Sequence, residues 1–181
     1  RLGSARVPLA DAAGLVLAAD VVAAEQVPPF ANTAMDGFAV RAADVASVPV
    51  TLEVIGTVAA GSTLDGAVGP GQATRIMTGA PMPDGADAVV MVEKTTLDEA
   101  AGTVLIDLSV SEGNHVRRAG EDVEPGDLLF AAGTVLTAGH LGVLASVGVQ
   151  EVECVRRPKV GVISTGDELV EPGAPLPPGG V

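Results

Sequence analysis

The sequence predicts an α+β protein that is mostly β, and three observations support this prediction. Short runs rich in Val, Ile and Thr recur between Gly and Pro residues, as in the strands of a small β-rich unit. One segment, Ala138–Val147, has the apolar spacing of an amphipathic helix. Lys159–Ser164 is a continuous Val/Ile run, which favours a strand buried on both faces of a parallel sheet. We therefore expect a β-rich part followed by the first strand of a truncated α/β domain.

The composition indicates a globular protein and argues against a nucleic-acid partner. The 181 residues are 48% hydrophobic, with a mean hydropathy of +0.44, so the chain can bury a core. Three Phe and no Tyr or Trp leave few side chains for stacking on bases, and a net charge of −13 opposes phosphate binding. Half of the ten basic residues nevertheless fall between Arg117 and Lys159, where a local positive patch can receive an anion.

The single cysteine, Cys154, excludes an internal disulfide and a Cys-cluster metal site, and its alternating surroundings predict a small core residue. The isolated His115 and His140 lack the spacing of a histidine metal site. The uncharged run Leu128–Val149 is long enough for a membrane span, but its glycines and hydroxyl residues divide it into shorter elements. With no visible signal peptide, we expect a cytoplasmic protein without a membrane partner.

The elements expected along the chain follow from local signals. Pro8 and Asp11 indicate a helix start, a turn follows at Ala12–Leu15, and Val16–Val22 resembles a strand. Beyond residue 41 we expect hairpins and meanders formed by Val50–Val58, Ala73–Met77, Ala88–Glu93 and Val104–Leu108. Strands are also expected around the helix, at Leu128–Ala131, Val135–Thr137 and Val149–Val155. The buried face of that helix is predicted to comprise Leu141, Leu144, Ala145 and Gly148.

The stretch Pro28–Arg41 is the most informative part of the sequence. Asp36-Gly37 is a turn signal, because Gly accepts φ > 0 and Asp can hydrogen-bond its own backbone. We therefore expect Asp36 in an exposed, rigid loop just before a strand that begins at Phe38. The residues alone leave two interpretations open, an ordinary Asx-type turn or a carboxylate presented to a ligand or metal.

Two further stretches place polar side chains beside turn residues. In Arg75–Val90, Thr78 is expected at the tip of a strand, in either a plain Pro-rich loop or an anion site. In Gly113–Asp127, Arg117 precedes Asp122 on a bend. This pair belongs either to a surface salt-bridge cluster of little energetic weight, or to a site where arginine contacts phosphate and Asp122 orients it or a metal.

The residue pattern changes after Arg156-Arg157-Pro158, which indicates a domain junction. The expected strand Lys159–Ser164 leads into Ser164–Leu169, which contains two hydroxyls, two carboxylates and a glycine. Ligands gather beyond the carboxyl ends of strands in open α/β sheets, so this segment is either an anion or magnesium corner or a simple helix N-cap. We expect the chain to be the front part of a longer protein.

Four stretches together resemble the MoeA family of molybdopterin molybdotransferases, whose eukaryotic relative is the E domain of gephyrin. Their order and spacing run through nearly the whole chain. They are Asn32–Arg41 (NTAMDGFAVR), Arg75–Ala80 with Asp84–Val90 (RIMTGA and DGADAVV), Val116–Asp122 (VRRAGED), and Arg157–Leu169 (RPKVGVISTGDEL). Three positions depart from the family pattern: Thr33 and Phe38 stand where Ser and Tyr are usual, and His115 stands where Asn is frequent.

This resemblance implies a function in molybdenum cofactor biosynthesis. Members of the family insert molybdenum from molybdate into adenylylated molybdopterin with release of AMP, aided by Mg²⁺, and work as homodimers. A molybdopterin adenylyltransferase, as a MogA-like domain or protein, is the implied upstream partner. The alternative is a non-catalytic dimerisation or scaffold module of the gephyrin E-domain type. We expect the 181-residue chain alone to be inactive, because most of the pterin-binding domain is missing from it.

The resemblance also implies a domain organisation. Residues 1–32 and 121–157 would form domain I, a β-rich linker domain, and residues 33–120 would form the inserted β-rich domain II. Residues 158–181 would start the α/β domain III. In this family the active cleft lies between domain II of one subunit and domain III of the other.

Carried over motif by motif, the resemblance assigns a role to nine residues. The catalytic residues would be Asp36, Thr78, Asp122 and Glu168. The substrate-binding residues would be Arg117, Ser164, Thr165, Gly166 and Asp167. Asp36 and Glu168 would also hold the Mg²⁺.

Overall fold

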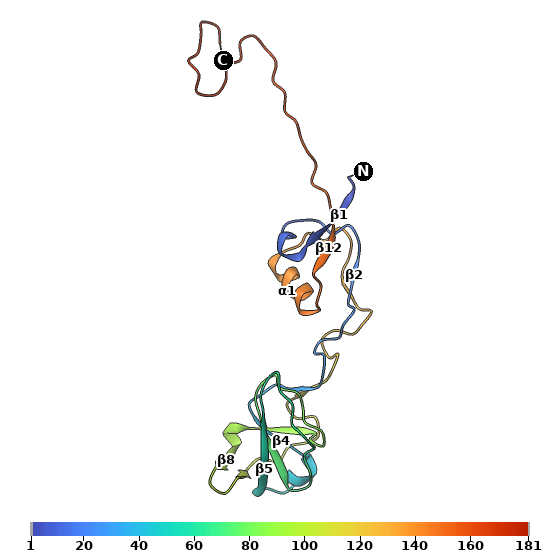
Figure 1. The fold of residues 1–181 in the computed structure, drawn as a ribbon, viewed down its shortest axis with the longest axis vertical. Coiled ribbons are helices and arrows are strands. Elements are labelled where there is room, and N and C mark those ends of the chain that lie inside the picture. Colours follow the sequence, from blue (N-terminus) through green and yellow to red (C-terminus); the bar gives the residue numbers. More distant parts are fainter. Residues whose placement is uncertain (1, 181) are drawn as a thin grey trace.

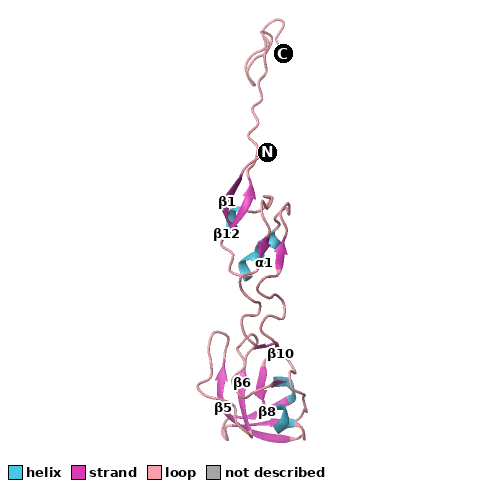
Figure 2. Ribbon diagram, turned by 90° about the vertical axis from the view of Figure 1, so that its right-hand side faces the viewer, coloured by secondary structure: helices cyan, strands magenta, loops and turns pink. Residues whose placement is uncertain are grey.

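The computed structural model describes residues 2–180 as an elongated molecule with two folded units and an extended C-terminal segment (Figures 1 and 2). Residues 2–27 and 123–155 form one unit, which we call the terminal unit, and residues 32–117 form the other, the sheet unit. Most of the regular structure is β, with one α-helix, and this confirms the predicted mostly β fold class. The domain bounds implied by the resemblance stay a prediction.

The terminal unit is built from two small antiparallel pairs and a helix. Strand β1 (Ser4–Pro8) pairs with β12 (Glu151–Val155), and β2 (Val21–Val22) pairs with β11 (Leu128–Phe130). A 3-10 turn, Leu9–Asp11, follows β1. The core beneath these elements consists of Ala12, Leu17, Leu136, Leu144, Val152 and Cys154. The predicted core position of Cys154 is therefore confirmed, and burial raises the pKa of its thiol.

Helix α1 (Ala138–Ser146) begins at a capping box, in which Thr137 accepts a hydrogen bond from the backbone of His140 while the His140 Nδ1 accepts one from the backbone of Thr137. The predicted helix is thus present, but its predicted buried face is partly wrong. Leu144 is buried and Leu141 half-buried, whereas Ala145 and Gly148 are exposed. Val147 is buried in their place, because a nine-residue helix packs only a narrow stripe against the core.

The sheet unit contains a six-stranded sheet in the order β7-β4-β6-β5-β9-β8. Its strands are β4 (Gly37–Val40), β5 (Val50–Val58), β6 (Gln72–Ile76), β7 (Ala88–Met91), β8 (Thr95–Asp98) and β9 (Thr103–Ile106). The 3-10 helices Ala42–Val45 and Val92–Lys94 follow β4 and β7. Because β5 pairs parallel to β6, these two expected strands do not form a hairpin; β8 and β9 do, but β8 was not among the expected strands. The Gly-rich residues 59–71 form a crossover connection instead of a tight turn.

Two hydrophobic cores cover the two faces of this sheet. The first core contains Phe38, Val40, Val45, Leu52, Ala73, Ala88, Val90, Val104 and Ile106. The second core contains Ala39, Val58, Ile76, Ala80 and Val89. Neighbouring residues of β4 alternate between the two, as the side chains of a strand covered on both faces must.

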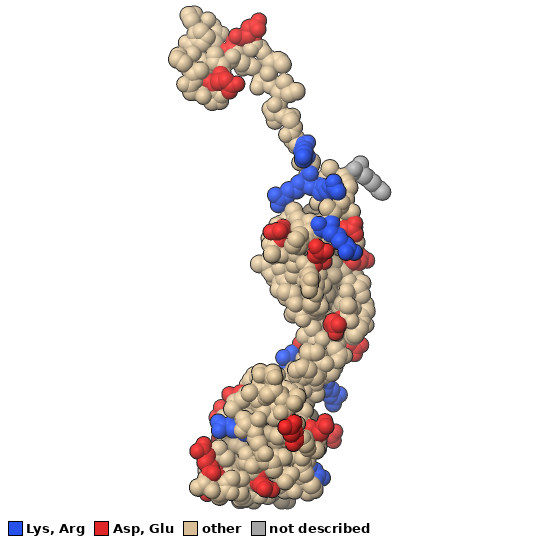
Figure 3. All heavy atoms as spheres, viewed as in Figure 1, with Lys and Arg blue, Asp and Glu red and all other residues tan. Residues whose placement is uncertain are grey.

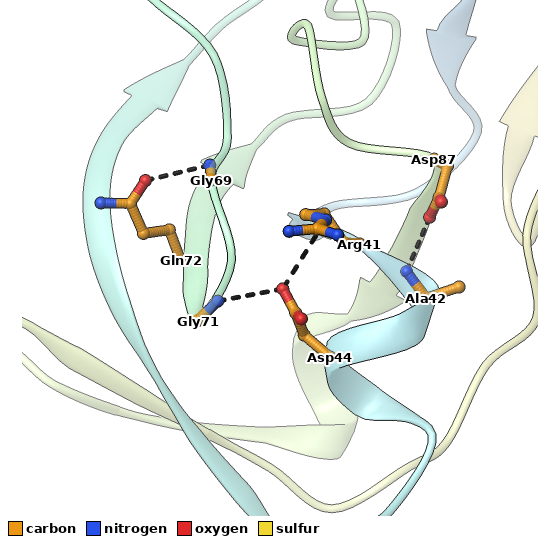
Figure 4. A network of polar contacts seen from close by, with 7 residues as sticks. All are labelled: Arg41, Ala42, Asp44, Gly69, Gly71, Gln72 and Asp87. Carbon is orange, nitrogen blue, oxygen red and sulfur yellow. Dashed lines mark hydrogen bonds and ion pairs between the residues drawn. The ribbon is translucent and has the colours of Figure 1, made fainter.

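A polar network fixes the connection that leaves β4 (Figure 4). The Asp44 Oδ2 accepts a hydrogen bond of 3.0 Å from the Gly71 backbone and lies 4.0 Å from the Arg41 Nε. The Asp87 Oδ1 accepts a bond of 2.6 Å from the Ala42 backbone. These carboxylates satisfy backbone donors that no strand partner reaches, so they stabilise the loop instead of forming a separate site.

Several expected strands are shorter in the structure or absent from it. Of Val16–Val22, only Val21–Val22 is a strand, while Val16 and Leu17 form isolated bridges to Val135 and Cys154. The predicted strand Val135–Thr137 is reduced to that single bridge. Conversely, β1 and β8 were not expected, because Arg, Pro and Asp weaken their β-branched pattern.

The expected strand Lys159–Ser164 is wrong for this structure, in which residues 156–180 contain neither helix nor strand and extend away from the terminal unit (Figure 1). Its apolar side chains are exposed, Val160 at 80%, Val162 at 89% and Ile163 at 87%. A strand of a parallel sheet needs neighbours on both sides, and no other strand of residues 2–180 pairs with this run.

Basic side chains gather where β12 passes into this segment, and Arg156, Arg157 and Lys159 are exposed there (Figure 3). They are three of the five basic residues that fall between Arg117 and Lys159, and the other two, Arg117 and Arg118, lie at β10, so the patch expected from the sequence is formed only in part. Throughout residues 2–180, no helix combines the length and hydropathy needed to cross a bilayer. The uncharged run Leu128–Val149 instead forms β11, a turn and α1.

The tight contact between β4 and β7 at Gly37 makes a stability prediction. A Cβ at Gly37 would lie 2.1 Å from the Val90 carbonyl oxygen, so Gly37→Ala should destabilise the sheet unit by about 1–3 kcal/mol. Urea unfolding, with hydrogen exchange at the amides of β4, measures this loss.

The matched control is Gly142→Ala in α1, where an added Cβ meets no atom within 4 Å. Because Ala favours a helix over Gly, we expect this control to gain about 0.5–1 kcal/mol. Equal unfolding free energies for the two variants would contradict the close-contact argument.

Candidate functional site

Asp36 lies in an exposed bend between β3 (Asn32–Thr33) and β4, as expected. The Thr33 hydroxyl shapes this bend, since it donates to the Met35 carbonyl at 2.7 Å and accepts from the Met35 amide at 3.1 Å. Gly37 differs from the expectation because its φ is not positive. A glycine is needed there for the close approach of β7, and not for a turn.

Asp36 and Thr78 are in direct contact. The Asp36 Oδ1 accepts a hydrogen bond of 2.6 Å from the Thr78 hydroxyl and one of 2.7 Å from the Thr78 amide. The hydroxyl bond lowers the pKa of Asp36 most and the amide bond lowers it next, desolvation opposes them, and the charge of Arg75 lowers it further. The carboxyl group is therefore ionised and held in one orientation at neutral pH, although it is exposed.

Backbone hydrogen bonds bring three distant stretches together at Asn32–Thr33. The Thr33 amide donates to the Ala80 carbonyl at 3.1 Å, and the Gly79 amide donates to the Thr33 carbonyl at 2.9 Å. On its other side, β3 pairs antiparallel with β10 (Val116–Arg117), so that Asn32 lies opposite Arg117. The loops that carry Asp36, Thr78 and Arg117 are thereby joined through the same two residues.

The bend before β10 places one residue in a left-handed backbone conformation. His115 has a φ of 55°, and it is the one non-glycine residue of the described chain with positive φ. His, like Asn and Asp, tolerates this conformation better than most residues. The His115 carbonyl accepts a hydrogen bond of 2.9 Å from Ala34, two residues before Asp36.

Arg117 and Asp122 form an ion pair through the Arg117 Nη2 and the Asp122 Oδ2. Both side chains are about half exposed, at 43% and 51%. Exposed pairs of this kind contribute little to stability, so the geometry fits a guanidinium held in place for an incoming group as well as it fits a simple surface pair.

The remaining predicted site residues lie elsewhere in the molecule. Glu168 belongs to the extended C-terminal segment, as do Ser164, Thr165, Gly166 and Asp167. This segment and the sheet unit lie at opposite ends of the molecule (Figures 1 and 2). A single chain therefore does not bring Asp36 and Glu168 together, and their joint role as metal ligands stays a prediction.

The best-formed hollows of the described residues lie away from the two contacts. None of these four, with volumes of 140 to 450 Å³, is lined by Asp36, Thr78, Arg117 or Asp122. Among residues 2–180, no group of three or more His, Cys, Asp or Glu side chains is placed to hold a metal ion. The site within one chain is therefore an open surface with one oriented carboxylate.

The site residues expected from the sequence did not include Arg75, whose charge reaches this surface. Arg75 opens the RIMTGA stretch, and its positive charge acts on the carboxyl group of Asp36. The RIMTGA motif could have indicated this residue, because an arginine among the apolar residues of a strand is rarely buried unless its charge is paired.

The Asp36–Thr78 contact can be tested by titration. Thr78→Val removes the hydroxyl donor and keeps the amide donor, so we expect the pKa of Asp36 to rise toward its ordinary value. Because the folded-state pKa is lowered, the contact is complete at neutral pH and is lost only as the pH falls through that lowered value.

Carboxyl ¹³C NMR of Asp36 measures the shift. Thr96→Val, at an exposed threonine of β8, is the matched control and should leave the pKa of Asp36 unaltered. A pKa that is the same in both variants would show that the hydroxyl does not hold the carboxylate.

Comparison with known proteins identifies the family. The family model for the MoeA N-terminal region (domain I and II) matches residues 1–148. The molybdopterin molybdenumtransferase of Haemophilus influenzae is 46% identical over 171 residues, which are 94% of this chain and 42% of that protein. The corresponding protein of Bacillus subtilis is 43% identical over 179 residues, which are 96% of this chain and 42% of that protein.

The crystal structure of the molybdopterin biosynthesis MoeA protein from Pyrococcus horikoshii is similar in fold as well. Its TM-score is 0.87 at 36% identity, covering 95% of this chain and 46% of that chain. The chain thus spans less than half the length of these relatives. The sequence match and the shared fold together show that the chain belongs to the MoeA family.

Proposed function

We propose that this chain acts as part of a molybdopterin molybdotransferase, which inserts molybdenum from molybdate into adenylylated molybdopterin and releases AMP. The observation that carries the proposal is the Asp36–Thr78 contact, in which an exposed carboxylate is ionised and fixed by two hydrogen bonds. Family membership supports the same reaction, because the curated relatives are molybdopterin molybdenumtransferases. The reaction places the protein in molybdenum cofactor biosynthesis, which we assign to the cytoplasm.

The donor set at Asp36 fits a hard cation such as Mg²⁺. Carboxylate and hydroxyl oxygens are the ligands that Mg²⁺ prefers, and Asp36 and Thr78 provide one of each. When bound, Mg²⁺ would neutralise charge on the phosphate groups of the adenylylated substrate. The chain's own contribution is to hold the Asp36 carboxylate in one orientation and to offer Arg117, already positioned by Asp122, to an anionic group.

A homodimer supports this function better than a single chain. The sheet unit, which carries Asp36, and the C-terminal segment, which carries Glu168, lie at opposite ends of one molecule, and in the proposed homodimer a second chain brings its Glu168 segment to the sheet unit. The substrate is already adenylylated, and we propose a MogA-like molybdopterin adenylyltransferase as the upstream partner. The alternative, a non-catalytic scaffold module, needs no ordered carboxylate on this surface.

Substitution of Asp36 in the complete protein tests the catalytic proposal. Asp36→Asn keeps the size of the side chain and removes its charge, so we expect molybdenum insertion to fall by about two to three orders of magnitude with the fold intact. Release of AMP from adenylylated molybdopterin, together with cofactor formation, measures the loss.

Asp107→Asn makes the same change at an exposed carboxylate with no side-chain hydrogen bond and should retain full insertion. Near-normal insertion by the Asp36→Asn protein would remove Asp36 from the mechanism, whereas no insertion by the unsubstituted complete protein would favour the scaffold role.

A further inference from the structure

One face of the six-stranded sheet changes from apolar to polar at the end where Asp36 lies. Phe38 of β4 and Ala73 of β6 belong to the first core. Moving two residues along β6 keeps the same face and leads from Ala73 to Arg75, which lies directly opposite Phe38. Asp36 lies in the bend just before β4, two residues before Phe38, and the charge of Arg75 acts on its carboxyl group.

A bulge in β5 adds a hydroxyl group to the same row. Val54 lies opposite Ala73, but Thr57 lies opposite Arg75, so three steps along β5 match two along β6. Leu52 accordingly packs in the first core while Val58 packs in the second, although strict alternation would place both on one face. The bulge therefore aims Thr57 toward the face of Arg75, in the way that bulges near binding sites re-aim side chains.

The side chains of Arg75 and Thr57 make no hydrogen bond or ion pair within residues 2–180. Arg75 is only partly exposed, yet among residues 2–180 its guanidinium makes no ion pair and no hydrogen bond. Arg41 and Arg117, in contrast, each lie beside a carboxylate. The Thr57 side chain is exposed. A guanidinium group offers five donors in a planar fork, which suits the oxygen atoms of a tetrahedral oxyanion.

We infer that Arg75 and Thr57 form an oxyanion subsite beside the Asp36–Thr78 pair. Its ligand is a tetrahedral oxyanion group, which in the proposed reaction is either a phosphate of the adenylylated substrate or molybdate. The inference rests on the proposed function for the origin of this ligand, whereas the donor set itself follows from the strand register. The Asp36 carboxylate repels the anion that the Arg75 guanidinium attracts.

The test measures binding of inorganic phosphate, AMP and molybdate to the 181-residue chain in Mg²⁺-free buffer, by calorimetry and by amide NMR shifts. We expect Arg75→Gln to weaken binding of the preferred anion about tenfold, equivalent to 1.4 kcal/mol, and Thr57→Val to weaken it about threefold. Arg6→Gln makes the same charge change on β1 in the terminal unit and should stay within about twofold of the unsubstituted chain.

The three probes distinguish the two sources of the oxyanion. Loss of AMP and phosphate binding in the Arg75→Gln chain assigns the subsite to the substrate phosphate, and selective loss of molybdate binding assigns it to molybdate. Equal affinities in the Arg75→Gln and Arg6→Gln chains, or no measurable binding of any probe to the unsubstituted chain, would overturn the subsite. Amide NMR spectra of each variant confirm that the fold is retained.

Asp36→Asn separates this inference from the proposed function. The substitution removes the repulsion and should tighten anion binding to the 181-residue chain, whereas insertion by the complete protein should fall by about two to three orders of magnitude. If the complete Asp36→Asn protein inserts molybdenum normally, the catalytic role of Asp36 fails and the subsite stands. If the unsubstituted complete protein inserts no molybdenum, the proposed function fails, and anion binding to the 181-residue chain still tests the subsite. If Arg75→Gln leaves the anion affinity unchanged, the subsite fails whatever the insertion assay shows.

Discussion

Backbone pairing around Asn32–Thr33 is the interaction on which the candidate site depends. These two residues are 7% and 1% exposed, and their amides and carbonyls join β10 on one side and residues 79–81 on the other. Because the joining is done by the main chain, the side chains of Asp36, Thr78 and Arg117 are not used to hold the loops together, and they form the Asp36–Thr78 and Arg117–Asp122 contacts instead. The shared strand also explains why motifs about forty residues apart act as one surface.

Much of this arrangement could be predicted from residue types. Val/Ile runs bounded by Gly and Pro indicated most strands of the sheet unit, and the i, i+3 spacing around Leu141 and Leu144 indicated the one helix. Asp36 was expected in an exposed loop before a strand, since Asp-Gly breaks the preceding pattern and Phe38 starts the next. Local signals sufficed for these elements because local backbone preferences decide them.

Features set by pairing partners could not be predicted in this way. The parallel alignment of β5 with β6 depends on a crossover whose length says nothing of its direction, and the bulge before Thr57 is invisible in a run that looks continuous. Gly37 was attributed to a turn, whereas its real constraint is the neighbouring carbonyl of Val90. The composition of Lys159–Ser164 favours a strand, but a strand forms only where it can pair with another strand. Within residues 2–180 no strand pairs with this run.

The sheet unit leaves the terminal unit through two chain segments and not one. Val27 and Val123 form a bridge, with further backbone hydrogen bonds of 2.9 Å from Asp122 to Val27 and from Gly120 to Pro28. A single connecting segment would let the two units rotate about each other. Two connecting segments joined by hydrogen bonds resist this twisting, so bending is the easier motion. The face that bears Asp36 therefore keeps its orientation about the long axis relative to the terminal unit.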